Sequence, residues 1–197
     1  MITIYGDRIS GNCLKVKWTC ERLGLSYAWK DIDVLRDETR DPSFLALNPA
    51  GQVPVVVLED GRTLAQSNAI ILHLAEGSAL IPGDAYARAK MLEWLFWEQY
   101  SHEPAVAVAR YRMKFLKQSR AEIGPALFER GAAALALLES ALEARSYLLG
   151  DTLTLADIAL VAYTRMAEDG GFALSEYPRV EAWIGRIEAE LPIAEGR

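Results

Sequence analysis

The spacing of apolar and polar positions changes near residue 75. Before that point, runs rich in apolar and β-branched residues predict strands at 2–5, 27–32, 53–58 and 62–64. Cys13, Val16 and Cys20 recur at helical spacing, with Lys15 and Lys17 outside that apolar set, and further helices are predicted near 42–47 and from residue 66. The predicted order is therefore β-α-β-α-β-β-α.

After residue 75 the apolar period is helical. Helices are predicted over 85–118, 120–145, 154–168 and 178–189, with glycine or proline between them. Pro104 is expected to kink or interrupt the first of these, because proline cannot donate a backbone hydrogen bond. The sequence thus predicts an α/β domain at 1–76, a linker at 77–85 and an all-helical domain at 86–197.

Composition and charge narrow the class of protein. The net charge is −6, and acidic and basic residues are mixed in both halves, so we expect no nucleic-acid partner. The first residues lack a signal-peptide pattern and no apolar run is long enough to cross a bilayer, so we expect a cytoplasmic protein with no membrane contact. Cys13 and Cys20 lie too far apart on one predicted helix to form a disulfide, which favours a reducing compartment.

Two segments carry a resemblance to a known family. Residues 48–56 read NPAGQVPVV and residues 64–71 read LAQSNAII. Together with the order of elements, they resemble the glutathione S-transferase superfamily over essentially the whole chain. The resemblance implies a thioredoxin-like domain followed by an all-α domain, glutathione as co-substrate, no metal, and a homodimer.

The first segment implies contacts with the middle and the glycyl end of glutathione. In the family the proline of the Val-Pro pair is cis, so Pro54 would expose the backbone of Val53 to the cysteinyl part of the tripeptide. By the same resemblance, Gln52 and Arg40 would face the glycyl end.

The second segment implies a site for the γ-glutamyl end. Gln66 and Ser67 stand where the family usually has an acidic residue or glutamine followed by serine. They are predicted to begin a helix, where a free N–H, a hydroxyl and the positive end of the helix dipole can hold a carboxylate.

A further segment of the family pattern, residues 150–159 (GDTLTLADIA), predicts a helix start in the second domain. Thr154 is a good N-cap, Asp157 can complete a capping box, and Leu153 and Ile158 can form a hydrophobic staple. We interpret this segment as important for folding and not for catalysis.

Glutathione chemistry requires a thiolate at neutral pH, so a donor must lie beside the sulfur. Ser10, in the sequence ISGNCLKVK, resembles the serine of some branches of the family and is the favoured donor. Tyr5 at the end of the first strand and the amide of Asn12 are alternatives. Ser10-x-x-Cys13 also has the spacing of a thioredoxin motif whose exposed cysteine is replaced by serine, and Cys13 is expected to be buried.

The family resemblance places a second-substrate pocket beside the first long helix, where His102, Tyr111 and Lys114 are candidates. The basic run over 110–120 is more simply interpreted as a solvated face. The two histidines have no metal-binding spacing. The expected function is transfer of glutathione to a small hydrophobic electrophile. A glutathione-dependent isomerase or thiol reductase and a non-catalytic binding or interaction module are the alternatives.

Overall fold

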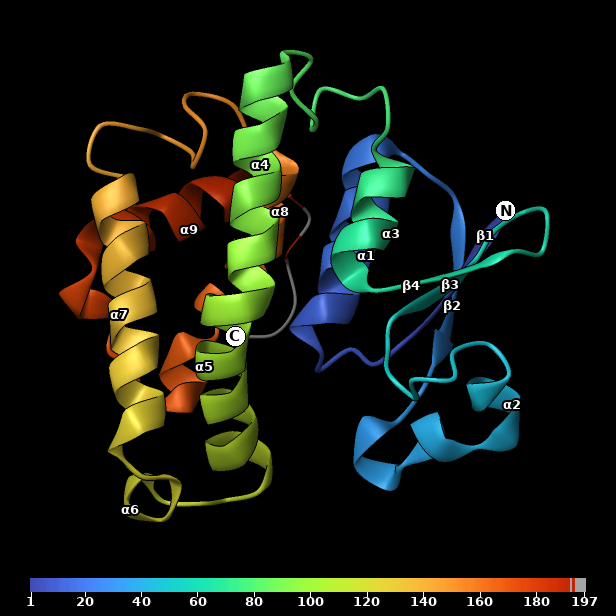
Figure 1. Ribbon diagram of the computed structural model, residues 1–197, viewed down its shortest axis with the longest axis horizontal. Coiled ribbons are helices and arrows are strands. Elements are labelled where there is room, and N and C mark those ends of the chain that lie inside the picture. Colours follow the sequence, from blue (N-terminus) through green and yellow to red (C-terminus); the bar gives the residue numbers. More distant parts are fainter. Residues whose placement is uncertain (192, 194–197) are drawn as a thin grey trace. The chain divides into compact units, whose positions relative to one another are not determined.

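The computed structural model describes residues 1–191 and 193, and it divides into two compact units, Met1–Ser78 and Ala79–Arg197 (Figure 1). The division falls inside the segment 77–85. Leu80 and Ile81, from that segment, are buried, and the Leu80 carbonyl accepts a hydrogen bond from the Leu155 amide at the start of a helix of the second unit. The end of the segment thus packs as part of the second unit.

The first unit contains a four-stranded mixed sheet. Its strands are β1 (Ile2–Gly6), β2 (Tyr27–Asp31), β3 (Val55–Val57) and β4 (Thr63–Ala65), in the order β2-β1-β3-β4. Strand β1 is parallel to β2 and antiparallel to β3, and β3 is antiparallel to β4. The run 53–58 contributes only three residues to β3, because Pro54 has no N–H to donate and Leu58 already forms the hairpin turn with Arg62.

Two helices complete the core of this unit. Helix α1 (Gly11–Leu23) and helix α3 (Ser67–Leu74) lie side by side (Figure 1), and Ile4, Val16 and Ile70 are fully buried. The short helix α2 (Pro42–Leu45) follows two 3₁₀ turns, η1 (Val34–Arg36) and η2 (Glu38–Arg40). The predicted element order is confirmed.

The second unit is helical. Its α-helices are α4 (Ala85–Trp97), α5 (Glu103–Arg110), α6 (Arg120–Ile123), α7 (Pro125–Ala141), α8 (Leu155–Thr164) and α9 (Pro178–Glu190). Two π-helical segments, η3 (Glu98–His102) and η4 (Tyr111–Phe115), flank α5, and two 3₁₀ turns, η5 (Ala167–Gly170) and η6 (Leu174–Glu176), precede α9.

The helix predicted over 85–118 is interrupted as expected. Pro104 is the second residue of α5, directly after the π-helical η3. Because proline offers no N–H to the preceding turn, the regular hydrogen-bond ladder breaks there. The prediction of a thioredoxin-like unit followed by an all-helical unit is confirmed.

Helix α8 is the centre of the second core, since all ten of its residues are buried. Its start is held by Asp157, whose carboxylate accepts hydrogen bonds from the Thr154 amide and hydroxyl, both at 2.9 Å. The same carboxylate accepts from the Leu148 amide at 2.9 Å and the Trp183 indole at 3.0 Å. The capping box predicted at Thr154 is confirmed, and its role is structural.

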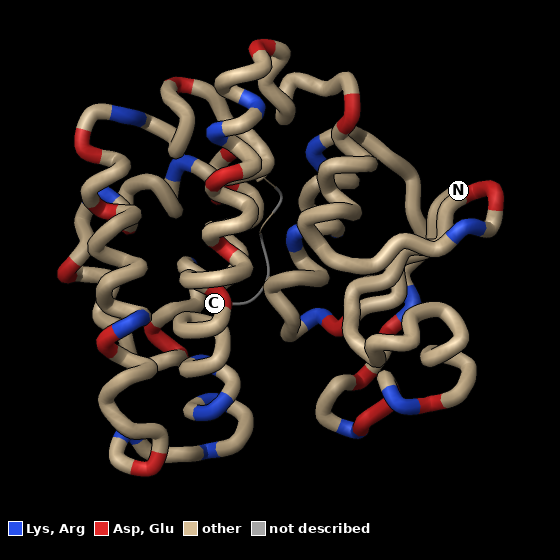
Figure 2. The backbone as a smooth tube through the Cα atoms, viewed as in Figure 1, with Lys and Arg blue, Asp and Glu red and all other residues tan. Residues whose placement is uncertain are grey.

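Acidic and basic residues are interspersed along both units (Figure 2). Over residues 1–191 and 193, no helix has both the length and the apolar character needed to cross a membrane. The same residues contain no group of three or more histidine, cysteine, aspartate or glutamate side chains arranged to hold a metal ion.

Candidate functional site

The first turns of α1 and α3 meet at one end of the first unit. Ser10 is the N-cap of α1, and Ser67 is the first residue of α3. A hydrogen bond of 3.1 Å from the Ser67 hydroxyl to Asn12 Oδ1 joins the two turns. Neither first turn contains an acidic residue, so the dipoles and N–H groups of both helices favour an anion at this place.

Ser10 has the extended backbone of an N-cap, with φ −85° and ψ 116°. Its Oγ accepts a long hydrogen bond of 3.4 Å from the Cys13 amide. A serine hydroxyl that accepts one bond still carries a hydrogen to donate. Since Ser10 is half-buried at a helix start, its hydroxyl can donate to a bound sulfur.

Cys13 itself is not a reactive thiol in this fold. It is fully buried, and burial raises its pKa to about 12, although hydrogen bonds from Ser10 and Asp7 act in the opposite direction. Burial likewise raises the pKa of Cys20 to about 12. Both cysteines are free thiols, and the predicted burial of Cys13 is confirmed.

The side-chain oxygen of Asn12 accepts hydrogen bonds from two donors. Lys15 Nζ donates to Asn12 Oδ1 at 2.8 Å, and the Ser67 hydroxyl donates to the same atom. The apolar spacing of α1 placed Lys15 outside the buried set, but the structure buries its side chain completely. The lysine occupies an interior position because its ammonium has a polar acceptor there.

Tyr5 lies in β1, paired with Lys30 of β2 and Val55 of β3. The Lys30 ammonium lies 3.2 Å from the Tyr5 hydroxyl and 5.1 Å from the centre of its ring. The tyrosine hydroxyl thus lies beside a cation of the neighbouring strand. Tyr5 is half-buried and keeps its place as the alternative donor to Ser10.

The loop before β3 has a defined shape. The Val53–Pro54 peptide is cis, as the family resemblance implies. Asn48 is buried and holds the loop from inside: its amide group donates to the Gln52 carbonyl at 2.7 Å, and its oxygen accepts from the Ala50 amide at 3.2 Å. The Gln52 side chain is exposed at the end of this loop.

Arg40 lies against the same loop. A Cβ placed on Gly51 would come within 2.4 Å of Nη1 of Arg40, and Gly51 has a φ of +61° that favours glycine. The close approach brings Arg40 and Gln52, the two candidates for the glycyl end, to one loop.

Gln66 has an unusual backbone for a non-glycine residue, with φ 70° and ψ 110°. A positive φ in a side-chain-bearing residue costs on the order of 1–3 kcal/mol, and such residues cluster at ligand sites. The side chain of Gln66 is exposed, whereas Ser67 is 5% exposed. The strained residue therefore stands directly before the first residue of α3.

The candidates for a second-substrate pocket lie in the second unit and differ in their surroundings. His102 is fully buried, and its Nε2 lies 3.0 Å from the Thr164 hydroxyl, which donates to the Leu160 carbonyl. Because that hydroxyl has only one hydrogen, His102 carries its proton on Nε2 and donates it to Thr164. The structure places His102 in the helical core, and its position does not support contact with a substrate.

Tyr111 and Lys114 lie in the π-helical segment η4. Tyr111 is 42% exposed and packs against Phe115. Lys114 Nζ donates to Asp169 at 2.7 Å, and Arg110 donates to the same carboxylate at 3.1 Å. Burial alone would raise the pKa of Asp169, but the hydrogen bonds from the two cations outweigh it and lower that pKa. Part of the basic run is therefore neutralised by an acid far along the chain.

A hollow of about 290 Å³ adjoins the start of α1. Its walls are the loop after β1, from Asp7 to Ile9, and the segment after β2. Asp7 fixes both walls, because its carboxylate accepts from the amides of Ile9 and Val34, each at 3.0 Å. The wall formed by the loop after β1 ends at Ile9, the residue that precedes Ser10 in the sequence.

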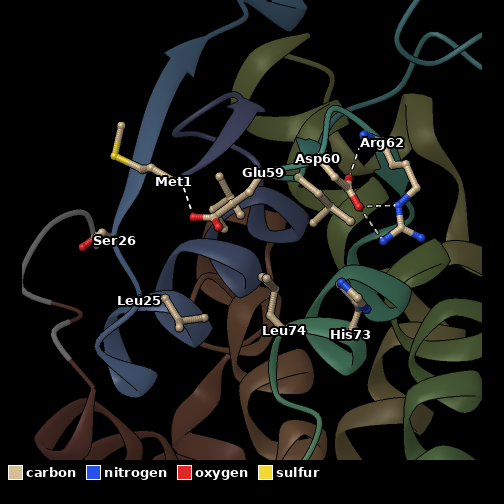
Figure 3. A pocket seen from close by; sticks show the side chains of 10 residues that line it. Met1, Leu25, Ser26, Glu59, Asp60, Arg62, His73 and Leu74 are labelled. Atoms are coloured by element: carbon tan, nitrogen blue, oxygen red, sulfur yellow. Dashed lines mark hydrogen bonds and ion pairs between the residues drawn. The ribbon is translucent and has the colours of Figure 1, made fainter.

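A hollow of about 550 Å³ lies at the other ends of α1 and α3 (Figure 3). It is lined by residues that follow α1, by the β3–β4 hairpin and by the last residues of α3, including Leu25, His73 and Leu74. Helix α1 has 13 residues and a length of about 20 Å, which separates this hollow from Ser10. Its charged groups already pair with each other, Met1 with Glu59 and Asp60 with Arg62, so it does not have the character of the reacting centre.

A thioredoxin-like unit, in which two helix starts without acidic residues meet, followed by a helical unit, defines the class of protein. Residues 9–76 match the family model of the glutathione S-transferase N-terminal domain, and residues 99–190 match that of the C-terminal domain. The chain belongs to the glutathione S-transferase family.

Individual relatives agree with this assignment. Glutathione S-transferase 3 of Zea mays is 30% identical over 95% of this chain and 89% of its own length. A glutathione S-transferase structure from Pseudomonas fluorescens is 45% identical, with a TM-score of 0.92 over 95% of this chain and 94% of that chain. A glutathione transferase from Burkholderia graminis is 26% identical, with a TM-score of 0.82 over 94% of this chain and 82% of that chain, and its structure holds two glutathione molecules per subunit.

Three residues of these surroundings were missed by reasoning from the sequence. Lys15 was assigned away from the apolar face, Asn48 was treated only as part of a motif, and Asp169 was given no role. The Asn-Pro pair at 48–49 is a turn signal that could have indicated the role of Asn48. The spacing of three residues between Asn12 and Lys15 could have indicated their contact, whereas Asp169 gave no local signal because its partners lie more than fifty residues away.

Proposed function

We propose that this protein binds glutathione at the starts of α1 and α3 and that Ser10 stabilises its thiolate for attack on a small apolar electrophile. The thiolate sulfur forms a bond to the electrophilic carbon while the leaving group departs with its electron pair. The thiol proton passes to solvent when glutathione ionises. The observation that carries this proposal is the meeting of two acid-free helix starts at Ser10 and Ser67.

Each part of glutathione has a proposed partner. The γ-glutamyl carboxylate binds at Ser67 and Gln66, where the helix start supplies N–H groups and positive potential. The backbone of Val53, next to Pro54, pairs with the cysteinyl part. The glycyl carboxylate binds near Arg40 and Gln52, which lie at one loop. No metal takes part in this proposal.

Ser10 is preferred over the other two donors for the sulfur. Tyr5 lies beside Lys30 on the neighbouring strand, and Asn12 already links α1 to α3 because its oxygen accepts from Lys15 and Ser67. The amide N–H₂ group keeps Asn12 as an alternative donor. Ser10 has its hydroxyl at the N-cap itself, where a thiolate also gains from the helix dipole.

The alternatives receive unequal support. A thiol reductase that uses its own cysteine is disfavoured, because Cys13 and Cys20 are buried thiols with pKa values raised to about 12. A glutathione-dependent isomerase uses the same thiolate and differs only in its electrophile. A binding module would keep the site at Ser67 and lose activation at Ser10.

The proposal extends to the assembly and location of the protein. We infer a homodimer, supported by large apolar side chains exposed on one side of the first long helix, Phe96 at 73% and Tyr100 at 88%. The free thiols fit a reducing cytoplasm and a role in detoxification. Tyr111 and Lys114 remain the proposed contacts for the second substrate.

The experiment that tests the function is an ultraviolet difference titration of bound glutathione against pH. An enzyme that activates the thiol is expected to show a thiolate signal that titrates well below the pH at which free glutathione ionises. Calorimetry on the same samples measures binding independently. Binding without a lowered thiol pKa would indicate a binding module, and no binding at saturating glutathione would contradict the proposal.

A further inference from the structure

Lys15 is one of the largest fully buried side chains among the described residues, with 0% of its surface exposed. Lysine normally keeps its ammonium in water, because burying a charge is costly unless it is well paired. Lys15 is also the fifth residue of α1, near the positive end of the helix dipole, where a cation is disfavoured. Burial and helix position both make a lysine costly here, so the contacts of its ammonium decide what this residue does.

The contacts of Lys15 lead directly to the proposed glutathione site. Its Nζ donates to Asn12 Oδ1 at 2.8 Å, and the Ser67 hydroxyl donates to the same oxygen at 3.1 Å. Two donors on one oxygen fix which end of the amide faces them. Asn12 is therefore a bridge between a buried ammonium on α1 and the first residue of α3.

The charge of Lys15 is also felt at the start of α1. Burial is the largest influence on Cys13 and raises its pKa to about 12, whereas the charge of Lys15 acts in the opposite direction, toward the thiolate. The Cys13 amide is bonded to Ser10 Oγ. An anion held by Ser10 would therefore lie within the same positive field.

We infer that Lys15 is a positioning residue for glutathione: through Asn12, which accepts from the Ser67 hydroxyl, it holds the first turn of α3 so that its backbone N–H groups can bind the γ-glutamyl carboxylate, and its charge strengthens the anion site at the two helix starts. This inference rests on the proposed function and names a residue that supports it without touching the ligand. Lys15 does not react in this scheme.

The test compares two lysines of the same helix. Lys15→Met removes both the donor and the charge, so we expect the Kd for glutathione to rise about tenfold or more, as for loss of a charge-assisted hydrogen bond. Lys17→Met is the matched control, because Lys17 pairs only with Glu21 among the contacts the structure gives, at 2.7 Å, and lies partly in solvent. Its Kd is expected to stay within twofold. Lys15→Arg, which keeps a charged donor, should restore most of the affinity.

Two further measurements separate positioning from a general effect on packing. In a double-mutant cycle, Lys15→Met should add little to Asn12→Ala, because both remove the same bridge. With a glutathione analogue that lacks the γ-glutamyl α-carboxylate, the loss of affinity caused by Lys15→Met should be much smaller than with glutathione. Additive effects in the cycle, or an undiminished loss with the analogue, would overturn the inference.

Titration of the wild-type protein with glutathione separates failure of the proposed function from failure of the role of Lys15. If the wild-type protein does not bind glutathione, the proposed function fails. If it binds and Lys15→Met binds equally well, only the role of Lys15 fails. Should Lys15→Met not fold, Lys15→Gln takes its place, because glutamine has no charge and its amide is one bond too short to replace the hydrogen bond from Lys15 Nζ to Asn12, so the Kd is again expected to rise. A wild-type Kd in that variant would overturn the inference.

Discussion

The starts of α1 and α8 have the same kind of cap, but we assign α1 to the proposed ligand site and α8 to the core. Each has a hydroxyl residue at the N-cap, Ser10 or Thr154, and a side chain at the third helical position, Cys13 or Asp157. In α8 that side chain is an acid, whose carboxylate accepts from four donors of its own unit. In α1 it is a buried thiol that supplies no negative charge.

The difference between these helix starts shows which of them can accept an anion from outside the chain. A helix N-terminus favours an anion, and the chain itself can supply one. At α8 the chain does so with Asp157, and the result is a fixed point of the core. At α1 and α3 no acidic residue lies in the first turn, so an anion bound there would have to come from a ligand.

The largest expected effect is at the structural start. Asp157→Ala leaves four donors without their acceptor inside the core and should lower the free energy of unfolding by roughly 3–5 kcal/mol. Urea unfolding measures the change, with Asp151→Ala, an exposed acid in the preceding turn, as the control. Glutathione binding by the folded fraction should be unchanged. A loss below about 1 kcal/mol would show that the two helix starts do not differ in this way.

The next effect is at the functional start. Ser10→Ala removes the proposed donor, so the pKa of the bound thiol should rise by about one to two units and kcat/KM should fall about 100-fold. The Kd for glutathione should change little. Ser119→Ala is the matched control, since Ser119 is also a serine N-cap, with a capping box to Glu122, and lies in the second unit. Unchanged turnover in Ser10→Ala would transfer the role to Tyr5 or Asn12.

A smaller effect, on stability at high pH, tests whether the cysteine thiols of α1 are buried and un-ionised in the folded protein. In the folded protein burial raises the pKa values of Cys13 and Cys20 to about 12, above the ordinary value of 9.0. The unfolded chain therefore releases these protons first as the pH rises. Stability from the buried thiols is complete below pH 9 and falls toward pH 12, by about 1.4 kcal/mol per pH unit and thiol.

Urea unfolding at about pH 8 and about pH 10 measures this slope. The double variant Cys13→Ala, Cys20→Ala should have a shallower slope than the wild type. Part of the slope should remain, because burial also raises the pKa of Tyr147 and of Tyr27. Equal slopes in the two proteins would mean that the thiols ionise alike in both states.

The smallest expected effect is at Tyr5. Tyr5→Phe removes a hydroxyl that lies beside Lys30, so kcat/KM should change less than about threefold, or less than about 0.7 kcal/mol. The steady-state rate with a fixed electrophile measures it. A fall as large as that of Ser10→Ala would make the strand tyrosine the donor and the N-cap serine a purely structural residue.

Local sequence patterns were sufficient for the element order of the first unit and for the helical character of the second. The apolar periods predicted both units, Pro104 predicted the break before α5, and Thr154 with Asp157 predicted a capping box. These features depend on neighbours three or four residues away, which is why they can be predicted from a single sequence. The strand predicted at 53–58 was too long, because pairing partners decide where a strand ends.

The sequence by itself determined the starts of α3 and α8 and which of the two contains an acid, because caps and dipoles depend on near neighbours in the chain. Only the tertiary structure decided which side chains meet. It buried Lys15, joined Asn12 to Ser67, placed His102 in the helical core, and paired Lys114 with Asp169. Contacts such as these, of Asn12 with Ser67 or Lys114 with Asp169, join residues more than fifty positions apart, and no local pattern encodes them.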